Sequence, residues 1–333
     1  MNNTTQKHNR TNFVCTVAIA LLLVTVLFGL LLGSTKLTAG QVLCALAGTQ
    51  SEQINVIIRN IRLPRVAAAV VAGVGLSVSG VLLQAVTDND LASPNIIGIN
   101  SGAGFAVIVM LALFPNAVFA LPFGAFFGAF GAAMLIVYTS SKIGVSKSTV
   151  VLAGVALTTI LNAAISFISV ADTDTMALYS HFSVGGLAGV TLGEIALPAV
   201  LVAISLAVAM ILSQQISILC LGDSLAASLG VRVKTLRIIC LVCASFCAAA
   251  VVSFAGLLGF VGLVVPHIAR ALVGKNVRSC LAVSALLGGA IVTAADMFGR
   301  VVLAPTEIPV GIVMAFIGAP FFLYLLLRRK HYD

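Results

Sequence analysis

Long apolar runs constrain the fold of this chain more than any other feature of its sequence. Of its 333 residues, 60% are hydrophobic and only 8% are charged, whereas about 25% of the residues of a soluble domain are charged. Several runs exceed the roughly 20 residues with which a helix crosses the hydrocarbon core of a bilayer. A β-barrel would show short alternating segments instead. The sequence therefore predicts an all-α, polytopic membrane protein with one transmembrane domain over residues 1–333.

Ten apolar segments can be placed along the chain, although hydropathy alone supports eight to ten spans because some segments are short. A cytoplasmic tail is expected over residues 1–12, and the first run is longer than a signal-peptide core of roughly 7–15 residues. Two longer polar segments, residues 34–60 and 172–193, separate neighbouring spans. The ten predicted spans are residues 13–33, 66–86, 95–114, 117–138, 149–170, 194–213, 237–258, 259–273, 280–303 and 308–327.

The basic residues predict which ends of these spans are cytoplasmic. With the N-terminus inside, thirteen Lys and Arg fall inside and five fall outside, which satisfies the positive-inside rule. Arg62, Arg65 and Arg300 lie at helix ends on the outer side, where an acidic partner would give them a use. The alternatives are an i,i+4 pair between Arg300 and Asp296 and interfacial snorkelling of Arg62 and Arg65.

One polar interruption is too short to be a domain and too regular to be a slack loop. Leu221, Leu225 and Leu229 recur every four residues, as on one face of a short amphipathic helix. Gly222 and Gly230 bracket that helix as end signals. The basic residues that follow are Arg232, Lys234 and Arg237. A short helix between two spans, with a basic flank, is well placed to contact a soluble cytoplasmic partner.

Motifs of common enzymes and nucleotide sites are missing from the sequence. A P-loop ending at Gly274-Lys275 would need glycine where Ala269 stands, and neither a Gly-x-Ser-x-Gly elbow nor a His-Glu-x-x-His helix occurs. Asp296 is the main carboxylate inside a span, and this scarcity argues against a proton-coupled carrier and an intramembrane enzyme. No cofactor is predicted, and no nucleic-acid partner, because no aromatic surface accompanies the basic residues.

Two features inside the spans have two interpretations each. Cys240, Cys243 and Cys247 share one helical face, which suits either a metal site or close packing between helices. Packing is the interpretation adopted, with no metal site, because no His or carboxylate accompanies the thiols. Gln84 is polar at membrane depth, and it either makes an interhelical hydrogen bond or lines a pathway.

Eight stretches of the sequence, in order, resemble the FecCD family of permeases, which serve ATP-driven importers of iron–siderophores, haem and cobalamin. They cover nearly all of the chain after the first span. Two positions depart from the family pattern: Asn89-Asp-Leu-Ala92 replaces Asn-Pro-Leu-Ala, and His181-Phe182 stands where relatives often carry Trp. The matching stretches are Arg62–Arg65, Gly75–Gln84, Leu91–Ala103, Leu152–Leu157, Gly222–Gly230, Gly259–Arg270, Asp296–Gly311 and Gly318–Phe321.

The resemblance implies a type II ABC importer permease fold with about ten helices, in the bacterial cytoplasmic (inner) membrane. It implies a second permease subunit, identical or different, two cytoplasmic ATPase subunits and an extracytoplasmic solute-binding protein. ATP hydrolysis would belong to the ATPases, so the chain itself would not be an enzyme. An iron–siderophore chelate is the expected cargo. Haem or cobalamin import, or a solitary ion-coupled secondary transporter, are the alternatives.

The resemblance also implies roles for particular residues. Arg62, Arg65 and Arg300 would face acidic residues of the binding protein. The second and fifth spans would line the pathway, with Gln84, and Lys147 and Ser148 would belong to the cytoplasmic gate. Residues 214–236 would form a cytoplasmic coupling loop in an ATPase cleft. Its coupling residues would be Gly222, Asp223, Ala226, Leu229, Gly230 and Arg237.

Overall fold

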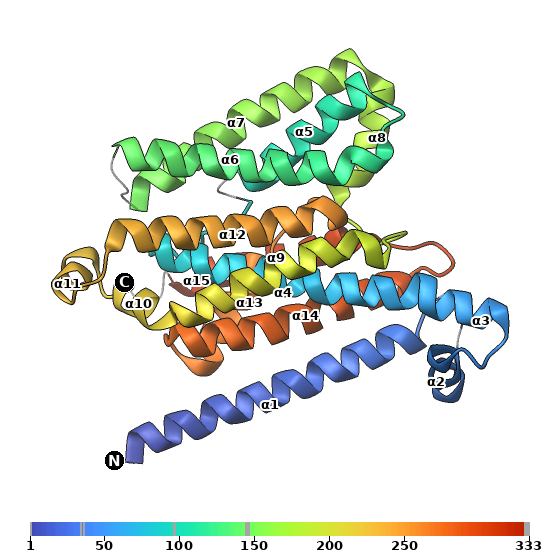
Figure 1. The fold of residues 1–333 in the computed structure, drawn as a ribbon, viewed down its shortest axis with the longest axis horizontal. Helices are drawn as coiled ribbons and strands as arrows, with labels where there is room; N and C mark the ends of the chain where they lie inside the picture. The colour runs from blue at the N-terminus through green and yellow to red at the C-terminus, as the bar shows by residue number, and fades with distance from the viewer. Residues whose placement is uncertain (1, 34, 36, 96–97, 144–146, 330–333) are drawn as a thin grey trace.

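The chain folds into a helix bundle, which a computed structural model describes at residues 2–33, 35, 37–95, 98–143 and 147–329 (Figure 1). Within these ranges the structure contains no strand, and the ten predicted spans are confirmed as apolar helices. The longer helices are α1 (Asn2–Leu31), α4 (Leu63–Thr87), α6 (Leu121–Ile143), α7 (Lys147–Ala171), α9 (Leu192–Ile211), α12 (Val233–Ala255), α14 (Val277–Val302) and α15 (Val310–Arg329). The two shorter ones are α5 (Ile99–Leu113) and α13 (Val261–Val273).

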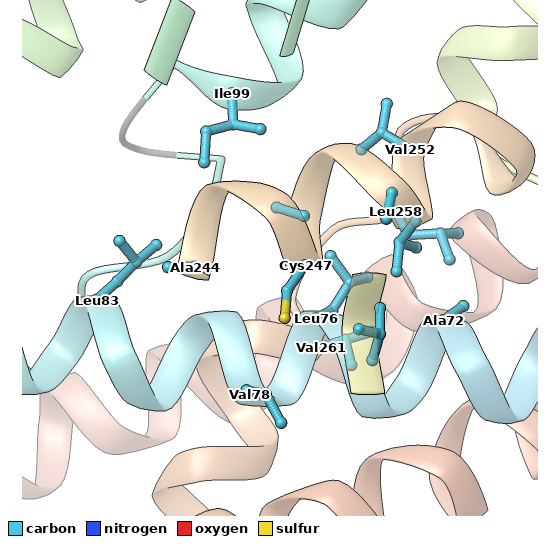
Figure 2. Close-up of a cluster of buried hydrophobic side chains, with 14 of the residues drawn as sticks. Ala72, Leu76, Val78, Leu83, Ile99, Ala244, Cys247, Val252, Leu258 and Val261 are labelled. Atoms are coloured by element: carbon cyan, nitrogen blue, oxygen red, sulfur yellow. The ribbon is translucent and has the colours of Figure 1, made fainter. Parts of the chain in front are cut away.

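Helix α4 lies at the centre of the bundle, surrounded by α9, α12, α13 and α14. Helix α4 belongs to a continuous helical run over Glu52–Thr87, and 78% of the 18 most apolar consecutive residues of that run are buried inside the protein. Figure 2 shows the apolar contact between α4 and α12, where Leu76 and Cys247 belong to one cluster of buried side chains. Cys240 and Cys243 are buried in the same cluster. Among the described residues no group of three or more His, Cys, Asp or Glu could hold a metal ion.

Glycines let α4 approach its neighbours more closely than any other residue would. A Cβ atom on Gly73 would collide with the backbone carbonyl oxygen of Gly288, and one on Gly80 would collide with that of Gly262. Helices in lipid associate through such close packing, because no hydrophobic effect drives them together. The small residues of the second span therefore fix the distance between α4, α13 and α14.

We expect Gly73→Ala to destabilise the bundle by about 1–3 kcal/mol, the range for an overpacked core. The new methyl group meets backbone, which cannot rotate away, so α4 and α14 would have to separate. Gly131→Ala is the matched control, because none of the described residues has an atom within 4 Å of a Cβ at Gly131 on α6. Thermal unfolding of the purified protein in detergent measures both variants. Equal melting temperatures for the two would refute the close approach at Gly73.

The two longer polar segments contain helices that hydropathy did not predict. Helix α2 (Ala39–Ala47) and α3 (Glu52–Val56) fall in the first segment, and α8 (Thr173–Val184) falls in the second. Helix α3 continues through a π-helical turn, η1 (Ile57–Arg62), into α4 as one run of 36 residues. At 1.5 Å per residue this run is about 54 Å long, well beyond the roughly 30 Å of the hydrocarbon core. Its first turns therefore project from the bundle beside α2 (Figure 1).

The polar connection after α4 turns back into the protein before α5 begins. Asp88 ends α4 in the left-handed region with φ of 46°, and Ala92 and Ser93 are buried. Figure 2 shows Ile99, the first residue of α5, close to the middle of α12. Asp90, which replaces the proline of the family pattern, pairs with Arg270 at 3.3 Å. An ion pair this exposed adds little stability.

Candidate functional sites at the two ends of the bundle

The polar interruption folds into two short helices at the end of the bundle that also holds the N-terminus (Figure 1). These are α10 (Ser213–Leu219) and α11 (Asp223–Ser228). The predicted glycine end signals are confirmed. Gly230 has φ of 83°, its N–H donates to the carbonyl of Ala227, and the N–H of Val231 donates to that of Ala226, both at 3.0 Å. This pair of bonds is a Schellman motif, in which glycine takes the left-handed position.

The expected coupling residues divide into an inner and an outer group. Ala226 is completely buried, and the buried guanidinium of Arg237 bonds the carboxylate of Asp223 at 2.6 Å. These three residues attach α11 to the start of α12. Leu229 belongs to the outer group, because its side chain is 58% exposed.

The three periodic leucines are all exposed on or beside α11, and we refer to them as the leucine stripe: Leu225 lies in the helix, Leu221 precedes it and Leu229 follows it. Leu221 is 65% exposed, Leu225 47% and Leu229 58%. A pocket of about 430 Å³ lies next to Leu229, between α10 and the start of α12. Exposed apolar side chains grouped beside a hollow are typical of a surface that contacts another protein. The sequence predicted this stripe, and the structure leaves it uncovered by the rest of the described chain.

Substitutions at Gly230 should rank by their tolerance of the left-handed conformation and not by their size. No atom of the described residues lies within 4 Å of a Cβ placed on Gly230, so Gly230→Trp meets backbone strain without a steric clash against them. We expect Gly230→Asn to destabilise the segment around α11 less than Gly230→Val does, because asparagine adopts positive φ more readily. For other residues the strain is about 1–2 kcal/mol. The total helix content of the protein would barely change when so short a helix is disturbed. The rate of limited proteolysis within residues 222–231 therefore ranks the variants. Equal cleavage rates would contradict it.

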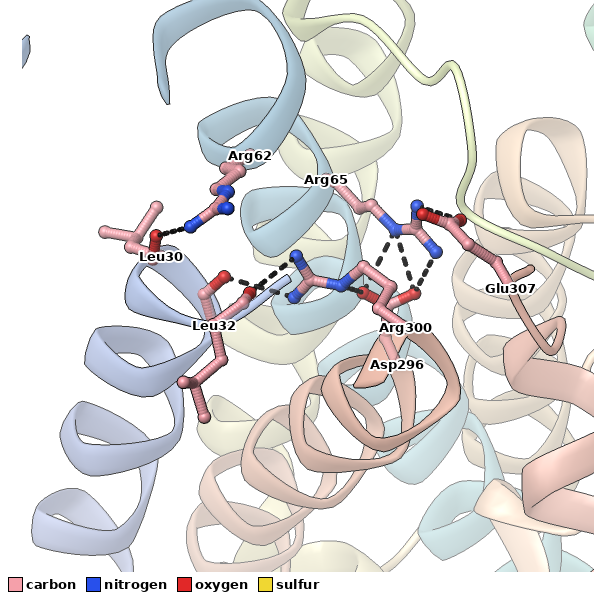
Figure 3. A network of polar contacts seen from close by, with 8 residues as sticks. Leu30, Leu32, Arg62, Arg65, Asp296, Arg300 and Glu307 are labelled. Carbon is pink, nitrogen blue, oxygen red and sulfur yellow. Dashed lines mark hydrogen bonds and ion pairs between the residues drawn. The ribbon is translucent and has the colours of Figure 1, made fainter. Parts of the chain in front are cut away.

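At the opposite end of the bundle, two arginines cap the last turn of α1. Arg62 donates to the carbonyls of Leu30 and Leu31, both at 2.8 Å. Arg300 donates to the carbonyls of Gly29 at 3.1 Å and Leu32 at 3.3 Å (Figure 3). The final carbonyls of a helix lack partners within the helix and carry partial negative charge. Both guanidinium groups therefore satisfy groups that would otherwise be orphaned.

Arg65 lies between two carboxylates from the other end of the sequence. Its Nε atom donates to Asp296 at 3.0 Å, and its Nη1 atom contacts Glu307 at 2.6 Å (Figure 3). Asp296 also pairs with Arg300 at 3.1 Å, which confirms the i,i+4 alternative for that arginine. Side-chain exposure is 8% for Arg65 and 2% for Asp296, but 38% for Glu307. We refer to Arg62, Arg65, Asp296, Arg300 and Glu307 as the arginine network.

The arginine network changes how the outer arginines are interpreted. Arg62, Arg65 and Arg300 are at most 6% exposed, so they do not snorkel, and each has acceptors within its own chain. Direct contact with a binding protein remains a prediction. Sequence reasoning missed Glu307 and the α1 carbonyls as partners, and only the spacing of Asp296 and Arg300 gave a signal. Arg59 acts similarly, because it donates to the carbonyls of Ala45 and Leu46 at the end of α2.

The expected pathway residues have different outcomes. The side chain of Gln84 is buried and bonds the carbonyl of Gly262 at 3.3 Å as well as the guanidinium of Arg270. It makes the interhelical hydrogen bonds of the alternative interpretation. Lys147 and Ser148 begin α7, but their side chains lie outside the described part of the structure.

The fifth span, α7, presents the most exposed surface of the bundle. Only 6% of its 18 most apolar consecutive residues are buried. Thr159, Asn162 and Ser166 are exposed at intervals of three and four residues, which places them on one side of the helix. Amides and hydroxyls on a membrane helix usually face protein or a water-filled cavity instead of lipid. This face of α7 is therefore suited to line a pathway, whereas α4, the second span, is enclosed.

The comparisons with known proteins assign this helix bundle to a class of membrane protein: the permease subunit of a type II ABC importer, with several spans in the cytoplasmic membrane. The sequence profile described as the FecCD transport family matches residues 21–328. The chain belongs to this family, whose members work with separate ATPase and binding-protein components and are not themselves enzymes.

Relatives of known name agree with this assignment. The chain is 36% identical to the Fe(3+)-citrate import system permease protein YfmE of Bacillus subtilis, over 98% of each chain. It is 36% identical to the ferric enterobactin permease protein FepD of Escherichia coli over 93% of each. It is 39% identical to the cobalamin permease protein BtuC of Halobacterium salinarum, over 84% of this chain and 75% of the relative.

A solved structure has the same fold. It is described as an inward-facing conformation of a metal-chelate type ABC transporter, and it superposes with a TM-score of 0.85 at 28% identity. The match covers 95% of this chain and 99% of the other. The prediction of a type II importer permease fold is therefore confirmed.

Proposed function

We propose that this chain moves an iron–siderophore chelate inward across the membrane, as one of two permease subunits above two ATPase subunits. The observation that carries the coupling role is the exposure of Leu221, Leu225 and Leu229 on and beside α11, the short helix between Gly222 and Gly230. We refer to α11 with Leu221, Leu225 and Leu229 as the knob. An apolar knob on the cytoplasmic side would fit a cleft in a soluble ATPase. The iron-citrate and enterobactin relatives support the cargo.

The contacts of α10 suggest how force would pass from an ATPase to the spans. Helix α10 touches both α4 and α14, and the pair between Arg237 and Asp223 holds α11 to α12. Movement of the knob would therefore shift the central helices together. A ligand shifts an equilibrium between two conformations of a transporter only if it binds them with different affinities. ATP-driven closure of the ATPases would therefore have to change their contacts with the knob. Lys147 and Ser148 stay the proposed gate residues.

The outer end of the bundle is the proposed docking place of the solute-binding protein. The arginine network brings the ends of α1, α4 and α14 together, and α2 projects beside them. In this proposal Arg62, Arg65 and Arg300 contribute mainly by shaping the surface, while Glu307 and Arg59 are among its exposed charged groups. The partner would meet a surface that the arginines hold in place.

Uptake by the reconstituted complex tests the proposed function. The permease, its ATPases and a binding protein would be placed in proteoliposomes and offered ⁵⁵Fe-labelled ferric citrate, haem and cyanocobalamin. We expect accumulation of the iron chelate that requires ATP and persists with an uncoupler. Accumulation of haem or cobalamin alone would reassign the cargo within the family. Uptake that collapses with the uncoupler while ATP is present would favour the solitary ion-coupled carrier.

A further inference from the structure

A polar pocket lies between the N-terminal end of α5, the middle of α7 and α8. Its volume is about 420 Å³, within the size range of small-molecule sites. Seven of its ten lining residues carry an amide or a hydroxyl, and none of the ten carries a charge. Seven polar side chains around one hollow, in a chain that is 60% hydrophobic, indicate that the hollow suits a polar occupant.

Two polar atoms in this pocket lack a hydrogen-bond partner among the residues that the structure describes. They are Oδ1 of Asn100 and Oγ1 of Thr158. Asn100 is only 4% exposed, so bulk water does not solvate its side chain freely. A buried acceptor without a donor is unfavourable, and a ligand that donates a hydrogen bond there would relieve that cost.

The backbone around the pocket is also built for a polar occupant. Helix α5 begins beside the middle of α12 instead of at a surface of the bundle (Figure 2). Non-helical backbone at membrane depth is tolerated where it is buried in protein or lines a cavity. Interrupted helices with their ends at mid-depth form substrate sites in other transporter folds.

The absence of charge in the lining selects the kind of ligand. A carboxylate or ammonium group would lose its hydration in this pocket without gaining a counter-charge. The amide and hydroxyl side chains of the lining, including the phenol of Tyr179, are neutral at physiological pH. Exposed Thr159 and Asn162 on α7 lie at its mouth, on the helix face proposed above as a pathway lining.

We propose that this pocket is a binding subsite for uncharged groups that donate hydrogen bonds, such as amide N–H and hydroxyl groups, on a solute that passes α7. The inference rests on the proposed transport function and adds a place in the chain where cargo is recognised. The pocket is too small for a whole chelate, so it takes one arm of it. An uncharged chelate with peptide amides should therefore bind here better than an anionic one.

Binding of ⁵⁵Fe-ferrichrome, an uncharged trihydroxamate chelate with peptide amides, tests the subsite. The assembled transporter in nanodiscs would be incubated with the probe and passed through a desalting column, with ferric citrate as the anionic comparison. We expect the double variant Asn100→Leu/Thr158→Val to weaken ferrichrome binding about tenfold through two lost hydrogen bonds. The ratio of ferrichrome to ferric citrate retained should fall accordingly.

Matched variants separate recognition from misfolding. Thr139→Val makes the same change on α6, away from the pocket, and should alter neither probe. Thr158→Val alone is isosteric, so it should fold even if the double variant does not, and it should lower the ratio by a smaller factor. Equal ratios in wild type and variants, or no ferrichrome binding by the wild type, would overturn the subsite. ATP-driven uptake of ferric citrate in the same preparation would still support the proposed function.

Discussion

Replacing Arg65 with glutamate should prevent the permease from reaching a stable folded state, well beyond any loss of a surface contact. The new carboxylate would lie between Asp296 and Glu307, where Arg65 now makes contacts of 3.0 and 2.6 Å. Removing one partner of a buried ion pair costs about 3–5 kcal/mol, and reversal of its charge adds repulsion. The measurement is the yield of monodisperse protein in detergent, with the melting temperature of whatever is recovered.

Two further variants make this result interpretable. Arg278→Glu reverses a charge at an exposed position on α14, and it should leave yield and melting temperature close to wild type. Arg65→Met removes the charge without reversing it and leaves Asp296 paired with Arg300, so its loss should be intermediate. If Arg65→Glu folded normally and only binding-protein docking were lost, the arginine would be a free surface group and the arginine network would be wrong for the working protein.

Placing a charge on the leucine stripe should abolish transport while leaving the permease folded. Leu225 is 47% exposed and does not support the bundle, so Leu225→Asp should not lower the melting temperature. At a protein interface the same change removes an apolar anchor and buries an unpaired carboxylate. Loss of one anchor costs about 2 kcal/mol or more, so ATP-driven uptake should fall at least about thirtyfold.

Co-purification locates the defect. A tagged permease with Leu225→Asp should lose its ATPase subunits in detergent, whereas Leu225→Met, which keeps an apolar side chain of similar volume, should retain them. This pair of variants is a more specific test of the coupling surface than a large residue at Gly230, because a substitution at Gly230 also strains the backbone. ATPases retained by Leu225→Asp, with uptake intact, would place the coupling surface elsewhere in the chain.

The spans were predictable because hydropathy is a local property of the sequence. The apolar composition of residues 237–258 is enough by itself to predict a membrane span there. Helix α12 begins within a few residues of the predicted start. Helices α2 and α8 were not predicted, because they are short and lie at the ends of the bundle, where polar residues are tolerated. Their caps are nevertheless local: Thr38 and Gln41 form a capping box on α2, and Asp172 caps α8.

The two candidate sites differed in how much the sequence revealed. The knob could be anticipated, since its glycines and leucines act through positive φ and helical period, both readable within ten residues. The arginine network could not, because Arg65 and Asp296 are 231 residues apart, and only the packing of α4 against α14 brings them together. Charge counting found the outer arginines but could not tell a partner in another protein from one in the same chain.

Burial alone would make helix α1 dispensable, since only 17% of its 18 most apolar consecutive residues are covered by the rest of the chain. The caps on its last turn imply the opposite. The carbonyl oxygens of this turn accept hydrogen bonds from the buried guanidinium groups of Arg62 and Arg300, so α1 supplies oxygen ligands to two positively charged side chains, beside those from Thr35 and Asp296. Without α1 both charges would lose part of their compensation where α4 and α14 meet, so membrane insertion of α1 becomes a condition for closing this end of the bundle.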